Sequence, residues 1–166
     1  MDGARRTLVV GGTGMLSGLC EAVPPRELVV AARFAGNRAA RARLDPEVER
    51  VRLDWSDEAS RAAFLDALDR FPGLTTGVLW IHSEAHDLSA AMLGRLSARA
   101  RPPRVVHVFG TGSGRHREAA GALAERAAAL GVPFEAVLLG RVDAPGGPRW
   151  MTDAEISARV ARAAFP

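Results

Sequence analysis

Six short apolar runs recur along the chain, and segments with helical periodicity separate them. Each run is rich in Val, Leu or Ile and nearly continuous in apolar residues, which is typical of strands that are buried on both faces of a parallel sheet. The runs are Thr7–Val10, Leu28–Ala32, Val48–Leu53, Gly77–Ile81, Val105–Phe109 and Phe134–Leu139. Their alternation with helices predicts an α/β fold: a doubly wound parallel sheet of about six strands with helices on both faces.

The segments between and after the strands predict helices at about Met15–Ala22, Asn37–Arg43, Asp57–Arg70, Leu88–Ala100, Arg115–Leu130 and Asp153–Ala164. Proline and glycine mark several ends, as in Pro24-Pro25 and Gly131-Val132-Pro133. Thr152 and Glu155 have the spacing of a capping box, which predicts the start of the last helix. The length of 166 residues predicts one domain, residues 1–166.

The first strand runs directly into a glycine-rich turn that precedes the first helix. Glycine lets a backbone approach phosphates closely, and the N–H groups that open the helix attract negative charge. The turn predicts a dinucleotide site formed by Gly11, Gly12, Thr13, Gly14, Met15 and Leu16, and an ordinary tight turn is the alternative. Ser17 stands where the stricter motif has its third glycine, a position that serves close packing and tolerates a small residue.

The end of the second strand bears on which cofactor binds. No Asp or Glu occurs between Leu28 and Leu44, whereas a site that prefers NAD(H) usually places a carboxylate there. Arg33, helped by Asn37 or Arg38, can pair with a 2′-phosphate, which predicts NADP(H) over NAD(H); the alternative is that Arg33 is only a solvated charge at a strand end.

Further residues are assigned to the same cofactor site. Asp54, after the third strand, can accept a hydrogen bond from the adenine amino group, or it can cap the following helix. Trp55 and Ile81 are placed beside the cofactor as well.

Together these motifs resemble the short-chain dehydrogenase/reductase superfamily, in its atypical Gly-Gly-Thr-Gly branch. The segment from Arg149 to Ile156 is similar to a late segment of small bacterial members of that group. The resemblance implies a Rossmann fold and a nicotinamide cofactor. The superfamily's acid–base pair is Tyr-x-x-x-Lys, but this chain contains no Tyr, and all 22 of its basic residues are Arg. Chemistry by that pair is therefore excluded.

Other residues are the candidates for chemistry. His82, after the fourth strand, is predicted as the general acid, because an imidazole can donate a proton at neutral pH; a hydrogen-bonded histidine that ends a strand is the alternative. Ser113, in a second glycine loop after the fifth strand, is a second catalytic candidate. Substrate contacts are predicted for His86, Thr111, Arg115 and Trp150; Trp150 can instead anchor the last helix, and Arg115 can be a solvated charge. No third ligand accompanies His82 and His86, so no metal is predicted, and His107 is expected to be buried with its hydrogen bonds satisfied.

Composition narrows the partners. The net charge of +3 comes from arginines spread among acids, which does not favour nucleic acid binding. No apolar run approaches the roughly 20 residues that cross a membrane, and the N-terminus is unlike a signal peptide, so a cytoplasmic location is predicted. Cys20 is expected to be a packed thiol. An Ala-rich face in the fifth helix can lie on the sheet or against a second subunit, which leaves a homodimer open.

The sequence thus predicts an NADP(H)-dependent oxidoreductase that acts on a small molecule with a carbonyl, imine or enone group. The alternative is a non-catalytic NADP(H)-binding sensor or partner protein that keeps the fold but has lost its active site.

Overall fold

A six-stranded parallel sheet forms the centre of the computed structural model, which describes residues 5–34, 43–110 and 114–166. The order across the sheet is β3-β2-β1-β4-β5-β6, and every neighbouring pair is parallel. The strands are β1 (Arg6–Val10), β2 (Leu28–Ala32), β3 (Glu49–Arg52), β4 (Leu74–Leu79), β5 (Arg104–Phe109) and β6 (Phe134–Leu138). The predicted doubly wound sheet is confirmed.

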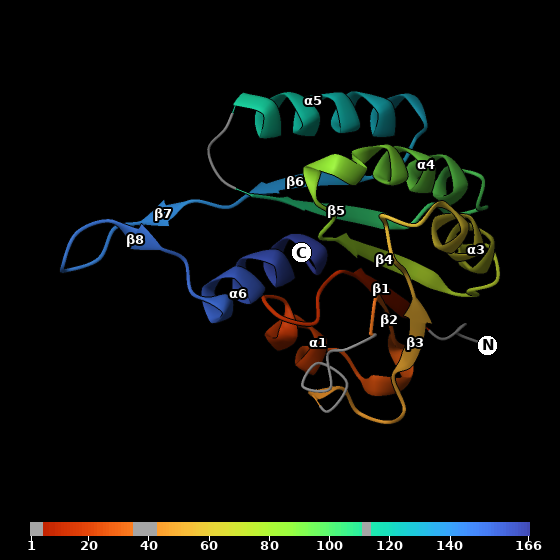
Figure 1. The fold of residues 1–166 in the computed structure, drawn as a ribbon, viewed down its shortest axis with the longest axis horizontal. Coiled ribbons are helices and arrows are strands. Elements are labelled where there is room, and N and C mark those ends of the chain that lie inside the picture. Colours follow the sequence, from red (N-terminus) through yellow and green to blue (C-terminus); the bar gives the residue numbers. More distant parts are fainter. Residues whose placement is uncertain (1–4, 35–42, 111–113) are drawn as a thin grey trace.

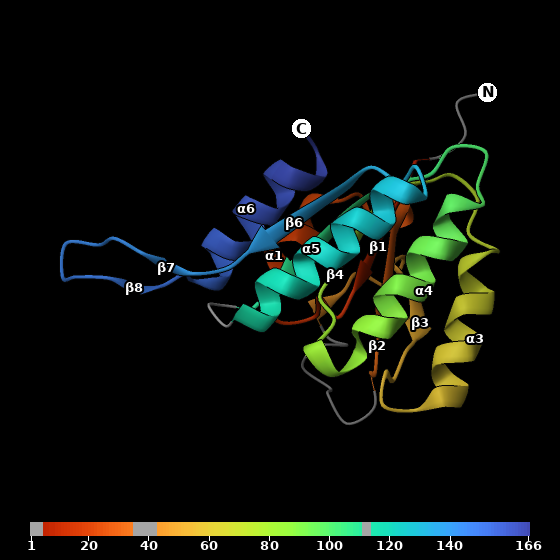
Figure 2. The same ribbon diagram turned by 90° about the horizontal axis from the view of Figure 1, so that it is seen from above.

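Helices cover both faces of this sheet (Figures 1 and 2). One face carries α3 (Glu58–Leu68), α4 (His86–Ser97) and α5 (Gly114–Ala129). The other carries α1 (Ser17–Ala22) and α6 (Asp153–Ala164), which pack against each other. Two short 3-10 turns, η1 (Pro25–Glu27) and η2 (Ser83–Ala85), precede β2 and α4.

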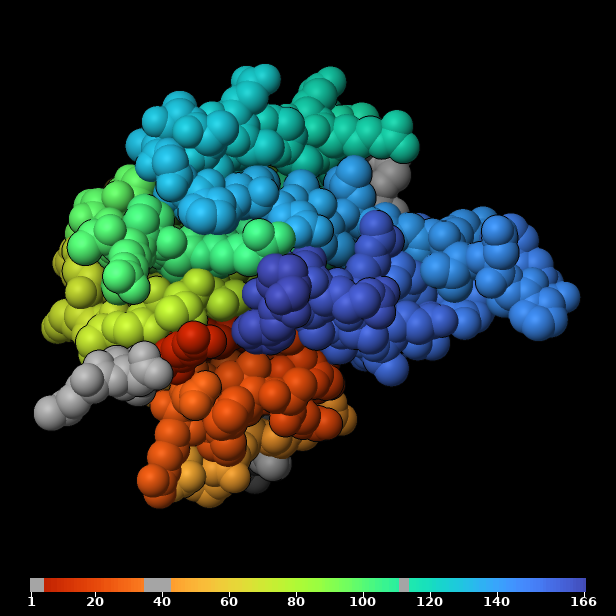
Figure 3. Space-filling model, turned by 180° about the vertical axis from the view of Figure 1, so that it is seen from behind, coloured from red at the N-terminus to blue at the C-terminus, as the bar shows by residue number. Residues whose placement is uncertain are grey.

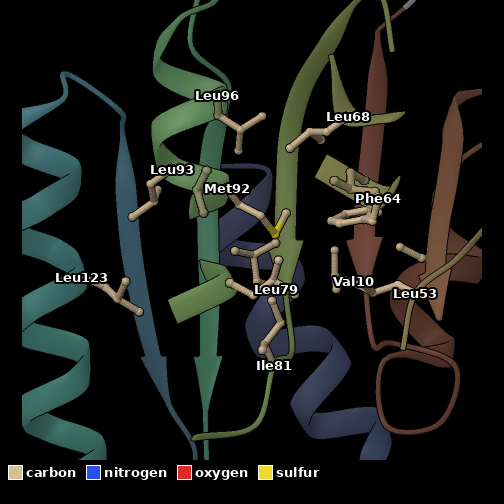
Figure 4. Close-up of a cluster of buried hydrophobic side chains, with 14 of the residues drawn as sticks. Val10, Leu53, Phe64, Leu68, Leu79, Ile81, Met92, Leu93, Leu96 and Leu123 are labelled. Atoms are coloured by element: carbon tan, nitrogen blue, oxygen red, sulfur yellow. The ribbon is translucent and has the colours of Figure 1, made fainter. Parts of the chain in front are cut away.

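Each face has its own hydrophobic core because side chains alternate along every strand. On β1, Leu8 and Val10 point toward α3 and α4, whereas Val9 points toward α1 and α6. Figure 4 shows the first core, in which Phe64 of α3 and Met92 of α4 lie beside side chains of β1 and β4.

The Ala-rich face of α5 belongs to the first core. Ala120, Leu123 and Ala127 are buried against the sheet, and Ala119 and Leu130 pack at its margin. Of the two alternatives for this face, the structure shows packing on the sheet. A homodimer stays a prediction to which no surface is assigned.

Local signals explain most element ends. Asp57 caps α3 by accepting a hydrogen bond from the Ala59 N–H, and the predicted capping box between Thr152 and Glu155 starts α6. The strand predicted at Gly77 begins three residues earlier, at Leu74, because Thr76 also pairs with β1. The helix predicted at Asn37–Arg43 lies almost wholly outside the described residues.

A hairpin that the sequence did not predict follows β6. Its two-residue strands, β7 (Arg141–Val142) and β8 (Arg149–Trp150), are antiparallel and project from the body of the molecule (Figure 3). Two contacts of 2.8 Å join Arg149 to the Glu155 carboxylate and so fasten the hairpin to the start of α6. Within the described segments, no helix has the length and apolar character needed to span a membrane.

Candidate cofactor and substrate site

The carboxyl ends of the strands bring most of the predicted site residues to one edge of the sheet. The chain winds from β1 to β2 on one side and to β4 on the other, so the order reverses beside β1. In open α/β sheets, ligands bind in the crevice outside the strand ends at such a switch point. Gly11 and Trp80 follow β1 and β4 there, and the Trp80 N–H donates to the Val10 carbonyl at 2.8 Å.

Glycine is required at the first two positions of the turn. Gly11 has φ +75°, and a Cβ on it would lie 2.2 Å from the carbonyl oxygen of Trp80. A Cβ on Gly12 would lie 2.4 Å from Cγ1 of Val9. In contrast, a Cβ on Gly14 would meet no protein atom within 4 Å. The turn is therefore closed on its sheet side and open at Gly14, where a phosphate has room to approach.

The helix after this turn begins at Ser17, so the predicted start at Met15 is wrong. Met15 and Leu16 form a turn instead, with the Ser17 N–H donating to the Gly14 carbonyl at 3.0 Å. The hydroxyl of Ser157 on α6 donates to the Met15 carbonyl at 3.0 Å, which fixes the turn against the last helix. With only six residues in α1, binding of a phosphate would depend mainly on the N–H groups of the turn itself.

The close contact expected at Ser17 falls one residue later. A Cβ on Gly18 would lie 3.2 Å from Cβ of Ser157. The small residues of this motif therefore let α1 approach α6 closely.

Cations and a carboxylate lie beyond β2 and β3. Arg33 is exposed at the end of β2. The pKa of Asp54 is lowered, first by hydrogen bonds from the hydroxyl and N–H of Ser56, and further by the charges of Arg33 and Arg52. Because the N-cap of α3 is Asp57, Asp54 is not the helix cap; it shapes the loop with Ser56 at 2.6 Å and 3.0 Å.

The backbone adopts a strained conformation just after Arg33. Phe34 has φ +54°, and its ring packs against the core cluster below α1. A left-handed conformation costs a residue with a side chain about 1–2 kcal/mol, and such strain concentrates at ligand sites.

Two tryptophans flank His82 beside the glycine turn. The Trp55 and His82 rings are 5.3 Å apart, and the Trp80 and His82 rings meet edge to face at 5.8 Å. Trp55 also lies 3.4 Å from the position of a Cβ on Gly11, so it reaches from the loop after β3 to the turn. The side chain of His82 is 53% exposed, and its Nδ1 lies 3.7 Å from the Glu84 carboxylate.

A cavity of about 170 Å³ opens between the loops that follow β4 and β5, and we call it the histidine pocket. Three imidazoles line it, together with apolar, small and acidic residues. Its lining consists of Trp80, Ile81, His82, Ser83, Glu84, His86, Phe109, Gly110 and His116. The predicted residues Ile81, His82 and His86 therefore lie together.

Sequence reasoning missed His116 as a pocket residue and chose its neighbour Arg115. Arg115 is exposed on the first turn of α5 and does not line the pocket. His116 is four residues before the buried Ala120, so the helical periodicity of α5 places it on the inner face. That spacing was the signal that could have found it.

His107 forms the buried wall behind the pocket, as predicted. It has no exposed surface, and its Nδ1 lies 3.1 Å from the Val108 carbonyl while its Nε2 lies 2.9 Å from the Ser89 hydroxyl. Since a carbonyl only accepts, Nδ1 donates and Nε2 accepts from Ser89. Burial, and then the neighbouring His86, lower the pKa of His107 from 6.5 to about 3.

The remaining candidates lie elsewhere. Trp150 is 58% exposed on the projecting hairpin and does not line the pocket; the residue that ties the hairpin to α6 is Arg149. Arg38, Thr111 and Ser113 lie outside the described residues. Among the residues that the structure does describe, no group of three His, Cys, Asp or Glu side chains could hold a metal ion.

A hollow larger than the histidine pocket lies away from this edge. It measures about 1120 Å³ and lies at the amino end of the sheet, lined in part by Arg5, Thr75, Arg99 and Phe165. None of the site residues that the sequence predicts lines this hollow. The histidine pocket and the glycine turn, although smaller, combine titratable groups with the switch point of the sheet, and we assign the site there.

Comparison with solved structures agrees with this topology. A protein from Thermus thermophilus described as a short-chain oxidoreductase is 24% identical, with a TM-score of 0.64 over 97% of this chain and 96% of that one. The type-2 3-hydroxyacyl-CoA dehydrogenase of Mycobacterium avium is 13% identical, with a TM-score of 0.67 over 98% of this chain and 90% of that one. The chain shares the Rossmann-type α/β fold of these proteins.

A third similar structure of this fold contains a nicotinamide cofactor. It is a short-chain dehydrogenase from Sphingobium yanoikuyae in complex with NADPH, 19% identical, with a TM-score of 0.60 over 96% of this chain and 85% of that one. No protein-family model matches the sequence, and no curated protein matches it. The fold expected from the resemblance is thus confirmed.

Proposed function

We propose that the protein is an NADP(H)-dependent oxidoreductase of atypical short-chain type that acts on a small carbonyl, imine or enone compound. The observation that carries the proposal is the glycine turn at the switch point of the sheet. Its backbone at Gly11 adopts a conformation that glycine favours, and its open side lies at Gly14. The NADPH bound by the Sphingobium yanoikuyae protein supports the same cofactor class.

The residues of this edge fit a dinucleotide. Gly11 to Leu16 would hold the pyrophosphate, while Asp54 and Trp55 would lie beside the adenosine. The exposed Arg33 would pair with a 2′-phosphate, with Arg38 as its proposed helper. The absence of any carboxylate between Leu28 and Leu44 removes the group that would repel that phosphate.

The histidine pocket would receive the substrate. Its volume of about 170 Å³ fits a small molecule beside a nicotinamide ring. When bound, the cofactor supplies or accepts a hydride, and the chain must manage the proton. His82 is the proposed proton donor, and Ser113 would assist it. The proposed substrate contacts are His86, Thr111, Arg115 and Trp150. Among all these residues, His82 and His86 line the pocket.

A second function is favoured by one observation, the absence of Tyr and Lys from the whole chain. A protein that binds NADP(H) without catalysis needs neither residue. It would keep the turn and Arg33 and act as a sensor or as a partner of another protein.

Calorimetric titration with NADPH and with NADH tests the shared assumption. We expect NADPH to bind more tightly, and Arg33→Ala to weaken NADPH binding at least about tenfold while leaving NADH unaffected, since one charge-assisted pair is worth about 1.5–3 kcal/mol. Arg26→Ala is the matched control. Arg26 is an exposed arginine just before the same strand, β2, and it forms an ion pair with Glu47. Failure of both nucleotides to bind would refute both functions.

Turnover separates the two functions. An enzyme should consume NADPH with at least one member of a panel of small aldehydes, ketones, imines and enones. Tight NADPH binding with no turnover across the panel would favour the non-catalytic protein.

A further inference from the structure

All four histidines of the chain gather at the histidine pocket. His82, His86 and His116 line it, and His107 lies directly behind His86. An imidazole is the side chain best suited to move a proton near neutral pH. These rings differ in how firmly their surroundings hold them and in how far they are exposed to solvent.

His86 is the ring that its surroundings orient. It packs edge to face against His107 and against Phe109, each at 5.4 Å between ring centroids. His107 and Phe109 are themselves stacked at 4.2 Å. Because His107 is immobilised by hydrogen bonds to Ser89 and Val108, this aromatic wall is rigid and holds His86 from behind.

His86 also has the protonation state that a base requires. Its pKa is lowered, first by burial and then by the neighbouring His116, while a hydrogen bond to the Ile81 backbone and the charges of Glu84 and Asp87 act in the opposite direction. Asp87 is engaged with Arg61. A neutral ring that donates one N–H to a carbonyl keeps its second nitrogen as an acceptor.

His82 is placed differently. More than half of its side chain is exposed, and its Nδ1 is 3.7 Å from Glu84, which is too long for a hydrogen bond. It lies between Trp55 and Trp80, on the side of the glycine turn. This position suits contact with the cofactor at the mouth of the pocket more than proton transfer inside it.

We propose that His86, rather than His82, is the acid–base residue of the pocket, acting on the carbonyl substrate of the proposed function or on its alcohol. The proposal rests on the proposed function. In the direction of oxidation, a ring nitrogen of His86 would take the proton of the substrate hydroxyl. A bound NADP⁺ would accept the hydride from the same carbon, so that the C–O bond becomes a carbonyl. In reduction, the imidazolium of His86 would return that proton to the oxygen, and NADPH would supply the hydride to the carbon.

Proton-linked binding tests this assignment without a known substrate. NADP⁺ carries a positive nicotinamide ring, whereas 2′-phosphoadenosine 5′-diphosphoribose is the same nucleotide without that ring. If His86 faces the nicotinamide, its protonation places two positive charges side by side and disfavours only the first ligand. The phosphates and the adenine that the two ligands share titrate equally in both. The ratio of the two dissociation constants therefore reports only the effect of the nicotinamide ring on affinity.

We expect the ratio of the dissociation constant of NADP⁺ to that of the nucleotide without nicotinamide to rise as the pH is lowered from about pH 8 to about pH 5.5. If bound NADP⁺ lowers the pKa of His86 by about one unit, the rise approaches about tenfold only below that pKa, so a rise of about twofold or more is expected at about pH 5.5. His86→Gln should abolish that rise while both ligands still bind. His82→Gln should retain the rise, and Arg95→Gln, on the exposed side of the same helix, is the matched control for a change in α4.

The outcomes are distinct. A ratio that does not change with pH in the unaltered protein, or a rise that persists in His86→Gln, would overturn the assignment. If neither nucleotide binds at any pH, the proposed function itself fails. If His86→Gln does not fold, ring NMR of the unaltered protein decides, since NADP⁺ should lower the pKa of His86 and the nucleotide without nicotinamide should not.

Discussion

The two ends of the glycine turn predict opposite effects of the same substitution. Gly11→Ala forces a side chain into the left-handed region at φ +75° and places its Cβ 2.2 Å from a backbone carbonyl oxygen. The conformation costs about 1–2 kcal/mol, and overpacking adds about 1–3 kcal/mol. Since the Trp80 carbonyl belongs to the chain that continues β4, it cannot move aside as a flexible side chain would. The sum is a loss of about 2–5 kcal/mol in the free energy of unfolding.

Gly14→Ala is the matched control. Its Cβ meets no protein atom within 4 Å, and its φ does not lie in the left-handed region. The free energy of unfolding should therefore stay within about 1 kcal/mol of the unaltered value, since alanine also restricts the unfolded chain. If a phosphate approaches this open side, the new methyl group should weaken NADPH binding at least about tenfold, or about 1.4 kcal/mol.

Urea unfolding and calorimetry separate the two effects. Urea midpoints with an unchanged m value report stability, and titration with NADPH reports the site. A Gly11→Ala variant as stable as the unaltered protein would refute the steric argument. A Gly14→Ala variant that binds NADPH normally would show that no phosphate approaches the turn there.

Three further predictions concern stability and reactivity. The pKa of His107 is lowered from 6.5 to about 3, so near pH 5.5 this imidazole takes up a proton only in the unfolded chain. The free energy of unfolding should therefore fall by about 1.4 kcal/mol per pH unit as the pH is lowered from about 6 to about 5. A Ser89→Ala/His107→Phe double variant should lose most of that slope in urea titrations, and an equal slope in both proteins would contradict the assignment. Burial raises the pKa of the Cys20 thiol to about 11, so iodoacetamide at neutral pH should label it only after unfolding; labelling at the rate of a free thiol would count against its burial. Thr152→Ala should cost about 1 kcal/mol by removing the cap of α6, measured by urea unfolding, and no change would mean that Glu155 holds the helix start alone.

Elements with a regular pattern could be predicted to the residue. Leu28–Ala32 is fully buried and Asp153–Ala164 starts at a capping box, and both have the predicted bounds. The hairpin at Arg141 to Trp150 could not be found, because strands of two residues carry no periodicity. Its attachment to α6 depends on an ion pair between Arg149 and Glu155, which no local sequence pattern predicts.

The sequence predicts where in the fold the candidate site lies better than it predicts which side chains contact one another there. Strand ends indicate the edge at which Gly11 and His82 both lie, because parallel strands finish on the same side of a sheet. They do not indicate which neighbour turns inward. Arg115 and His116 are adjacent in sequence, and only the helical periodicity set by the buried Ala120 distinguishes them. The 2.2 Å approach at Gly11 likewise depends on a loop that is distant in sequence, at Trp80.

The composition of the chain restricts which group can move a proton at this edge. Tyrosine is absent, and every basic residue is an arginine, whose pKa is too high for proton exchange at neutral pH. Cys20 is buried below the other face of the sheet with its pKa raised. The Glu84 side chain is mostly exposed to solvent. Among the described residues of the pocket, the imidazoles are thus the groups suited to acid–base chemistry, and the choice between an enzyme and a binding protein becomes the question of whether one of these rings contacts the nicotinamide.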